Sequence, residues 1–199
     1  MSQTTTIDLM RHGEPVGGRR YRGQIDDPLS DKGWSQMRQA VTGVTPWEAI
    51  VSSPLKRCAE FARELSEHMG VGLSYDERFK EVGFGTWEGL SGDQIRALDE
   101  KALERFYHDP IEHRPDGAEP LKSFNERVSE AYEAVISRHA GQHVLIVTHA
   151  GVIRSILRKT LQAPLASMYR ISIETASLTR IQITSERPPT VHFVSRESL

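Results

Sequence analysis

The chain has 199 residues, of which 38% are hydrophobic, and a formal net charge of −2, so we expect one domain over residues 1–199 with a substantial core. This charge lacks the basic surplus of nucleic-acid-binding proteins, and no apolar run approaches the roughly 18 residues of a membrane span, so neither nucleic acid nor membrane is an expected partner. The N-terminus has no signal-peptide pattern and the one cysteine cannot form an internal disulfide, which predicts a cytoplasmic protein.

Short apolar runs alternate with helical patterns along most of the chain. They predict strands at residues 7–10, 49–52, 72–75 and 144–148, and helices over residues 30–41, 54–70, 124–139 and 151–161. The tail differs, because residues 169–173, 176–183 and 191–194 have strand patterns with few helical residues between them. We therefore predict an α/β fold: one three-layer domain with a mostly parallel central sheet, an antiparallel edge strand and helices on both faces.

Two long segments have no such pattern. Residues 17–28 and 108–120 are polar and rich in Gly or Pro. Long loops of this kind in a compact domain often carry function, so we expect both to lie near a site.

Two histidines follow predicted strands. The run Met10-Arg11-His12-Gly13-Glu14 comes directly after the first strand, and Thr148-His149-Ala150-Gly151 ends the strand at 144–148. Ligands of open α/β sheets bind outside the carboxyl ends of the strands. His12 and His149 are therefore candidates for one site.

The residues around these histidines suit phosphoryl transfer. Arg11 offers a planar set of donors for phosphate oxygens, and a neutral His12 has a ring nitrogen that can attack phosphorus. Arg57, about one turn into the helix that follows the strand at 49–52, adds a second cation. His149 would supply further charge, and the small Ala150 and Gly151 would let backbone N–H groups approach phosphate. We expect no metal ion and no cofactor, because two arginines and a charged second histidine supply the positive charge.

A departing alkoxide needs a proton. The segment from Glu81 to Gly89 has two carboxylates among glycines and aromatic residues, and a carboxyl group in a partly desolvated pocket can act as a general acid. These residues by themselves do not distinguish Glu81 from Glu88.

Five segments in this order resemble the histidine phosphatase superfamily, in its phosphoglycerate mutase-like branch. They are Leu9 to Glu14, Tyr21 to Ser30, Ser52 to Arg57, Glu81 to Gly89 and Val147 to Gly151. The resemblance implies a phosphohistidine at His12, with Arg11, Arg57 and His149 binding the phosphoryl group. It also implies that Glu81 is the proton donor and that Glu88 belongs to a structural turn. Gly23 and Gln24, in the second segment, are candidates for substrate contact.

Softer features resemble the α-ribazole phosphatase group of cobalamin synthesis. They are the segments at residues 106–110, 115–119 and 163–170. The substrate they favour, a small phosphorylated metabolite, is α-ribazole 5′-phosphate. The chain departs from the common family pattern at Pro15, Gly18, Ala118 and Pro120, which flank the expected leaving-group pocket.

Other readings stay open. A broad-specificity small-molecule phosphatase would share every catalytic residue, whereas a phosphoglycerate mutase or fructose-2,6-bisphosphatase would differ in its substrate or in where it sends the phosphoryl group. A non-catalytic phospho-ligand binding module is the alternative from another class, although it would need neither His12 nor Glu81. Exposed strands in the tail would allow a homodimer.

Several further residues are interpreted as structural. Glu14 and Glu119 are expected to support the site, and Arg22 to lie in a surface loop or touch the substrate. His139 and His143 have the spacing of a metal pair, but residues 140–142 indicate a helix end between them. Cys58 is expected to be a small buried residue of its helix.

Overall fold

A six-stranded sheet forms the centre of the protein. The computed structural model describes residues 4–43 and 47–196. The strands lie in the order β3-β2-β4-β1-β5-β6 and are β1 (Thr5–Arg11), β2 (Ala49–Ser52), β3 (Gly72–Tyr75), β4 (His143–Thr148), β5 (Leu178–Ile183) and β6 (Thr190–Arg196). The first four strands pair in parallel, whereas β5 runs antiparallel to both β1 and β6. The predicted sheet, mostly parallel with an antiparallel edge, is confirmed.

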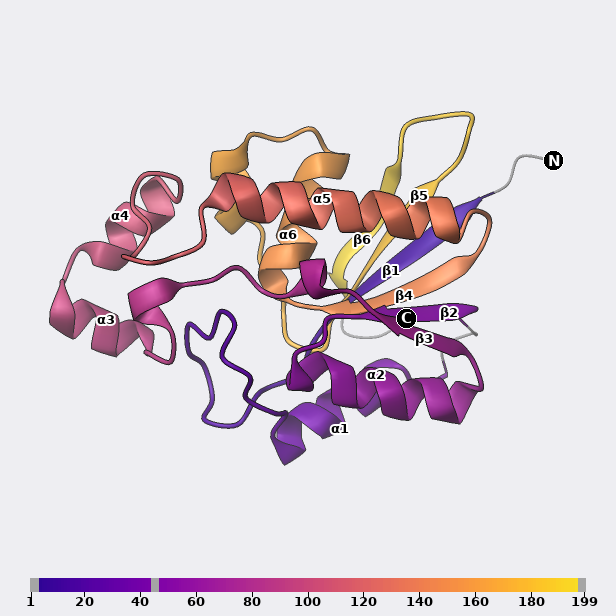
Figure 1. Cartoon of the computed structure of the whole chain (residues 1–199), viewed down its shortest axis with the longest axis horizontal. Helices are drawn as coiled ribbons and strands as arrows, with labels where there is room; N and C mark the ends of the chain where they lie inside the picture. The colour runs from indigo at the N-terminus through magenta and orange to yellow at the C-terminus, as the bar shows by residue number, and fades with distance from the viewer. Residues whose placement is uncertain (1–3, 44–46, 197–199) are drawn as a thin grey trace.

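Helices cover both faces of this sheet (Figure 1). On one face lie α1 (Asp31–Ala40) and α2 (Lys56–Met69), and on the other lie α5 (Leu121–Arg138) and α6 (Ala150–Thr160). Each face has its own buried hydrophobic cluster. Three 3₁₀ helices, η1 (Glu77–Phe79), η2 (Gly85–Trp87) and η3 (Leu165–Arg170), lie in the connections.

Two short helices, α3 (Gly92–Leu98) and α4 (Ala102–His108), extend beyond the carboxyl ends of the parallel strands (Figure 1). The sequence patterns did not predict these two helices. Each has only seven residues, too few to show a helical periodicity of apolar residues. A capping box at Ser91 and Gln94 begins α3, and this was the local signal that could have revealed it.

Local chemistry explains where the predicted helices begin and end. The Ser30 side chain accepts from the Gly33 N–H at the start of α1, as serine N-caps do. Gly70 ends α2 in the left-handed conformation, with φ 68°, which costs glycine little. Arg57 lies in the first turn of α2, one residue after its start, so the prediction that it follows a full turn was wrong.

The largest error in the secondary-structure prediction concerns the tail. Residues 169–173 are not a strand; η3 ends at Arg170 and the chain then runs on without a strand partner. The Tyr169 ring instead packs against Phe106, with 4.8 Å between ring centroids. β5 also begins two residues later than predicted, because Ala176 has a positive φ of 57°.

Candidate active site

Two histidines meet at the carboxyl ends of β1 and β4. Arg11 lies opposite Thr148 in the register of these strands, and the His12 N–H donates to the Thr148 carbonyl oxygen at 2.9 Å. A histidine therefore follows each strand at the same level of the sheet. The His12 and His149 rings lie edge to face with 5.2 Å between centroids, so the structure brings the two motifs together.

The hydrogen bonding of His12 defines its reactive nitrogen. Its Nδ1 lies 2.7 Å from the Gly13 carbonyl oxygen, and a carbonyl can only accept, so Nδ1 is assigned the proton and Nε2 the lone pair. Burial, and then the charges of Arg57 and Arg11, hold the pKa of His12 well below its usual 6.5. A neutral ring with a free Nε2 is the form that a nucleophile requires.

Two arginines, Arg57 buried and Arg11 half-buried, act on this ring through their charge. Arg57 donates to the carbonyl oxygens of Gly23 and Ile25 at 2.8 and 2.6 Å, and Arg11 donates to that of Ile173. Among the described residues, the Nε of each arginine is buried without a hydrogen-bond partner. Burial, and then the charge of Arg154, lower the pKa of Arg11 to about 10, so it stays charged at neutral pH. These two guanidinium groups can therefore receive an anion.

His149 differs from the prediction in one respect. Its Nε2 lies 2.8 Å from the Ser53 hydroxyl, and Cys58 Sγ lies 3.7 Å from the same nitrogen. Burial, and then the charge of Arg57, hold the pKa of His149 well below 6.5. The expected charged histidine is thus a neutral one that can donate a hydrogen bond, until a phosphoryl dianion favours its protonation.

Glu81 reaches the same pocket from another connection. Its two carboxylate oxygens accept from the Val82 N–H at 2.9 Å and from the Gly151 N–H at 3.1 Å. A Cβ at position 151 would lie 2.2 Å from Glu81 Oε1, so only glycine allows this approach. The Gly151 N–H that the sequence assigned to phosphate is therefore occupied by Glu81, beside His149.

A family model for the histidine phosphatase superfamily (branch 1) matches residues 7–195. This range contains every residue of the pocket just described. The chain belongs to the histidine phosphatase superfamily.

Curated relatives of this chain carry several names. A bifunctional protein of Mycobacterium tuberculosis is 29% identical over 200 residues, covering 96% of this chain and 54% of its own length. The chain thus spans about half the length of that relative. Phosphoserine phosphatase 1 of Hydrogenobacter thermophilus is 29% identical over 185 residues, covering 90% of this chain and 87% of its own length.

Solved structures resemble this chain over nearly its whole length. YhfR of Bacillus stearothermophilus has a TM-score of 0.85 and 29% identity, covering 96% of this chain and 97% of its own. The α-ribazole phosphatase of Shigella flexneri has a TM-score of 0.80 and 24% identity, covering 98% of each chain. The second likeness is one of fold alone.

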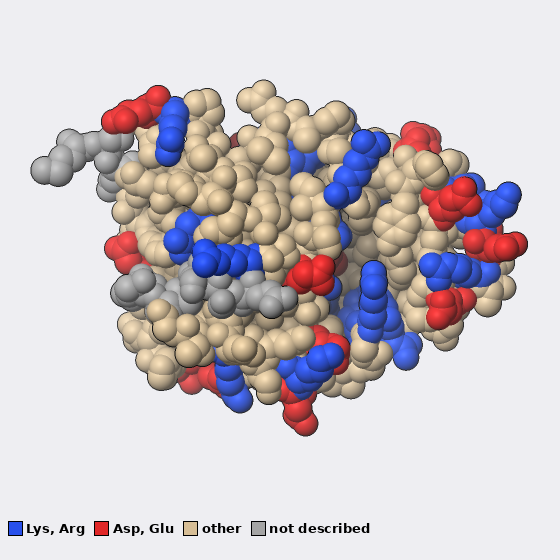
Figure 2. All heavy atoms as spheres, turned by 180° about the vertical axis from the view of Figure 1, so that it is seen from behind, with Lys and Arg blue, Asp and Glu red and all other residues tan. Residues whose placement is uncertain are grey.

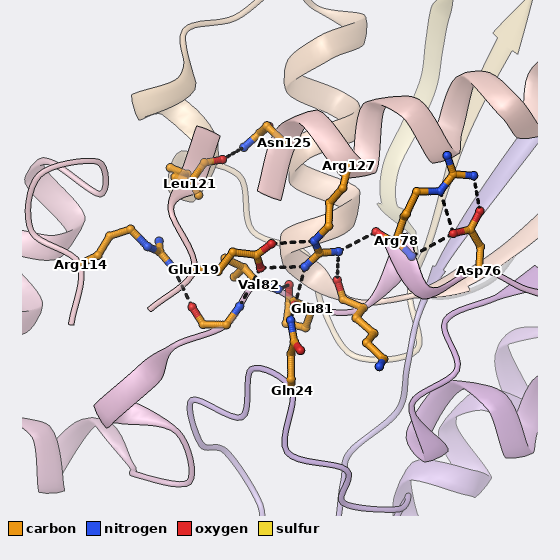
Figure 3. Close-up of polar contacts among 12 residues, drawn as sticks. Gln24, Asp76, Arg78, Glu81, Val82, Arg114, Glu119, Leu121, Asn125 and Arg127 are labelled. Carbon is orange, nitrogen blue, oxygen red and sulfur yellow. Dashed lines mark hydrogen bonds and ion pairs between the residues drawn. The ribbon is translucent and has the colours of Figure 1, made fainter. Parts of the chain in front are cut away.

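The backbone that carries Glu81 is clamped by Arg127 of α5. Arg127 donates to the carbonyl oxygens of Arg78, Lys80 and Glu81 at 2.6, 2.8 and 3.1 Å. It also forms a bidentate ion pair with Glu119, at 2.7 and 2.8 Å. Figure 3 shows the guanidinium between Glu119 and the segment that leads to Glu81. The interpretation of Glu119 as a supporting residue agrees with this geometry.

The predicted substrate-contact loop lies against the acid loop. Glu88 Oε1 accepts from the N–H groups of Gln24 and Phe84, both at 3.0 Å, so Glu88 joins two loops as a structural turn residue would. Gln24 also donates from Nε2 to the Glu81 carbonyl oxygen at 3.4 Å. Gly23 contributes its carbonyl oxygen to Arg57. Ala150 follows His149 at the start of α6 and is buried.

The remaining candidates lie in structural contacts. Glu14 pairs with Lys32 at 2.8 Å, and Arg22 with Asp27 at 2.9 Å. His139 follows the last residue of α5 and His143 begins β4, so the helix ends just before His139 and not at residues 140–142, and the two histidines do not share a helix. Cys58 is buried in α2, as expected.

Four polar side chains near the pocket were not predicted from the sequence: Ser53, Arg114, Arg127 and Arg154. Arg154 follows Gly151 by three residues, which on a helix places it on the same face; this spacing was an available signal. Arg114 and Arg127 reach the site only through tertiary packing. In residues 4–43 and 47–196, no helix has the length and apolarity to cross a bilayer.

Proposed function

We propose that the protein is a metal-independent phosphomonoesterase that forms a phosphohistidine at His12. The observation that carries this proposal is the neutral His12 ring, with Nδ1 hydrogen-bonded to a carbonyl and Nε2 free. The His149 ring contacts the His12 ring, and the charges of Arg57 and Arg11 act on it; all three side chains can donate to phosphoryl oxygens.

The reaction proceeds in two steps. His12 Nε2 attacks phosphorus, the bond from phosphorus to the ester oxygen breaks, and Glu81 donates a proton to the departing alcohol. Water then attacks phosphorus, Glu81 takes its proton, and the bond from phosphorus to Nε2 breaks to release inorganic phosphate. Arg11 and Arg57 stabilise the equatorial oxygens in both steps.

Two other functions differ in the fate of the phosphoryl group. A mutase returns it to a bound substrate, and a binding module never accepts it. The nucleophile and the acid held within one pocket favour an enzyme, because a binding module requires neither. Only 38 positions separate Leu90 from Val128 in the sequence, which leaves little room for the longer insertions expected of mutases.

The identity of the phosphomonoester substrate is a separate question from the mechanism. The sequence motifs favour α-ribazole 5′-phosphate. A broad-specificity phosphatase would use the same catalytic groups. The cytoplasmic location and the homodimer are likewise predictions from the sequence.

The decisive experiment measures phosphate release by the wild type and His12→Ala, in EDTA, with p-nitrophenyl phosphate, α-ribazole 5′-phosphate and 3-phosphoglycerate. We expect wild-type turnover to fall by at least about 1,000-fold in His12→Ala, while the exposed-site control His68→Ala keeps it. Quenching of wild type in alkaline detergent should trap a base-stable phosphoenzyme that releases its phosphate in acid. Turnover that survives in His12→Ala would refute the proposal.

A further inference from the structure

Two arginines at the mouth of the pocket are left without an anionic partner. Arg127 pairs with Glu119 and Arg22 with Asp27, but neither Arg114 nor Arg154 forms an ion pair with any carboxylate in the described parts of the chain. Unpaired guanidinium groups close to other cations repel them, which raises the electrostatic energy of the free protein. A bound anion would lower this energy.

Arg114 lies on the side of the acid loop. Its Nη2 donates to the Gly83 carbonyl oxygen at 3.0 Å, two residues beyond Glu81, and its guanidinium lies 5.8 Å from the centre of the Phe84 ring. Its Nε and Nη1 are buried and have no hydrogen-bond partner within residues 4–43 and 47–196. Two donors of this arginine are therefore available to a ligand.

Arg154 lies on the side of the phosphate-binding arginine. Its Nε donates to the Ile171 carbonyl oxygen at 2.8 Å, while Arg11 donates to the carbonyl oxygen of Ile173. The two guanidinium groups thus bind carbonyl oxygens that lie two residues apart in the same segment. The charge of Arg154 also helps to lower the pKa of Arg11. Among the described residues, no acceptor binds the Nη groups of Arg154, so these donors are also available.

Tyr169 lies between these two arginines. The Arg154 guanidinium lies 5.6 Å from the centre of its ring, and its buried hydroxyl lies next to Arg114. Burial raises the pKa of Tyr169 to about 12, although Arg114 acts in the opposite direction and Glu81 adds to the rise. The hydroxyl is therefore a neutral donor that lies close to Arg114, Arg154 and the acid.

With a phosphomonoester bound, the positive charges around the site outnumber the negative ones. A phosphomonoester dianion balances Arg11 and Arg57, and Glu81 must be protonated to act as the acid. Glu174 also acts on Arg11, but neither Arg114 nor Arg154 pairs with a carboxylate of the described residues, so two positive charges remain near the acid loop and Arg11. Figure 2 shows Lys and Arg side chains along the hollow between the body of the domain and its α3–α4 end. The leaving-group side of the site is thus cationic.

We propose that Arg114, Arg154 and the Tyr169 hydroxyl form a second anion subsite that binds a carboxylate or a second phosphate on the leaving alcohol. This inference rests on the proposed phosphatase function and narrows its substrates to esters with an anionic alcohol. α-Ribazole 5′-phosphate releases a neutral nucleoside, so the charge of the rim opposes the substrate that the sequence motifs favoured.

The test compares kcat/KM for five esters in wild type, Arg114→Gln, Arg154→Gln and Tyr169→Phe. O-Phosphoserine and 3-phosphoglycerate carry a carboxylate and fructose 2,6-bisphosphate a second phosphate, whereas p-nitrophenyl phosphate and α-ribazole 5′-phosphate have no further anion. In each arginine variant, we expect kcat/KM for the preferred anionic ester to fall at least tenfold more than kcat/KM for p-nitrophenyl phosphate, mainly because KM rises. Tyr169→Phe should reduce kcat/KM for the anionic ester by a smaller factor.

Two controls separate this subsite from other effects. Arg170→Gln removes an exposed charge next to Tyr169 and should not change the ratio of the two kcat/KM values. Arg114→Lys keeps the charge and should recover part of the lost preference. Inhibition of p-nitrophenyl phosphate hydrolysis by 3-phosphoglycerate should weaken in Arg114→Gln by a larger factor than inhibition by inorganic phosphate.

The outcomes are distinct. Equal losses on both kinds of ester in the arginine variants, or a wild-type preference for α-ribazole 5′-phosphate over every anionic ester, would overturn the subsite and leave the phosphatase proposal intact. Absence of any wild-type turnover, p-nitrophenyl phosphate included, would refute the proposed function, and the subsite with it.

Discussion

Two buried polar clusters on the same strands differ in how their charges are satisfied. The first surrounds Asp8 of β1, which accepts from Trp47 at 2.8 Å, from His143 at 2.8 Å and from Arg180 at 2.7 and 2.9 Å. The second is the phosphoryl site, where the Nε atoms of Arg11 and Arg57 have no partner among the described residues. His143 begins β4 and the phosphoryl site follows its end.

The pKa values express this difference. Burial by itself would raise the pKa of Asp8, but the hydrogen bonds from Arg180, His143 and Trp47 outweigh it, and the pKa is lowered. At the phosphoryl site, burial and neighbouring arginines lower the pKa values of His12 and His149 together. One cluster is complete within the protein, whereas the other becomes complete only when an anion binds. The comparison teaches that incomplete charge compensation, more than burial, distinguishes the functional site.

The largest expected effect comes from breaking the complete cluster. Asp8→Asn removes the charge that pairs with Arg180, and we expect a loss of about 3 kcal/mol in the free energy of unfolding, measured by urea denaturation. Asp93→Asn breaks an exposed ion pair with Arg96 and should cost less than about 1 kcal/mol. Equal losses in the two variants would mean that the Asp8 cluster is not special.

Completing the second cluster should have the opposite effect. Inorganic phosphate at about 100 times its Kd should raise the free energy of unfolding of wild type by about 2.7 kcal/mol. Arg57→Gln should lose most of this gain at the same phosphate concentration, because one of the two receiving cations is gone. Arg38→Gln, which alters an exposed arginine paired with Glu64, should retain it; a similar gain in Arg57→Gln would contradict the assignment.

A third cluster, the Arg127–Glu119 clamp, is complete and yet adjoins the site. Arg127→Gln should displace the Glu81 loop and reduce kcat for glycerol 2-phosphate by about 10- to 100-fold, the range of a general acid's contribution. The loss on p-nitrophenyl phosphate should be much smaller, because nitrophenolate departs without a proton. Arg78→Gln, whose side chain pairs with Asp76, should show no such leaving-group dependence. Equal losses on both esters in Arg127→Gln would indicate a purely structural role.

The smallest effect concerns pH. The unfolded chain takes up protons on His12 and His149 near pH 6.5, whereas the folded protein binds them only at lower pH. The free energy of unfolding should therefore be largest above about pH 6.5 and decrease as pH falls, by at most about 1.4 kcal/mol per pH unit for each histidine. His149→Asn should reduce this slope between pH 6.5 and 5.5, and the exposed His68→Gln should not. An unchanged slope in His149→Asn would count against a neutral His149.

The sequence predicted the parallel core of the fold well, for reasons visible in particular residues. Apolar runs such as the one before Arg11 identify buried strands, and Ser30 and Gly70 identify helix ends through local hydrogen bonds and backbone freedom. The tail was harder. Residues 169–173 have an apolar alternation that suits a strand, but their environment is the aromatic group around Phe106 and the two arginines that hold Ile171 and Ile173.

The sequence by itself determined that His12 and His149 lie at one edge of the sheet. Each histidine directly follows a predicted strand, and the end of a strand can be recognised from the local pattern of apolar residues. What only the tertiary structure decided is the state of the charges there. The proton on His12 Nδ1, the neutral His149 and the unpaired donors of Arg114 and Arg154 depend on burial and on neighbours far away in the chain. Desolvation and charge coupling arise from three-dimensional packing, which no local spacing encodes.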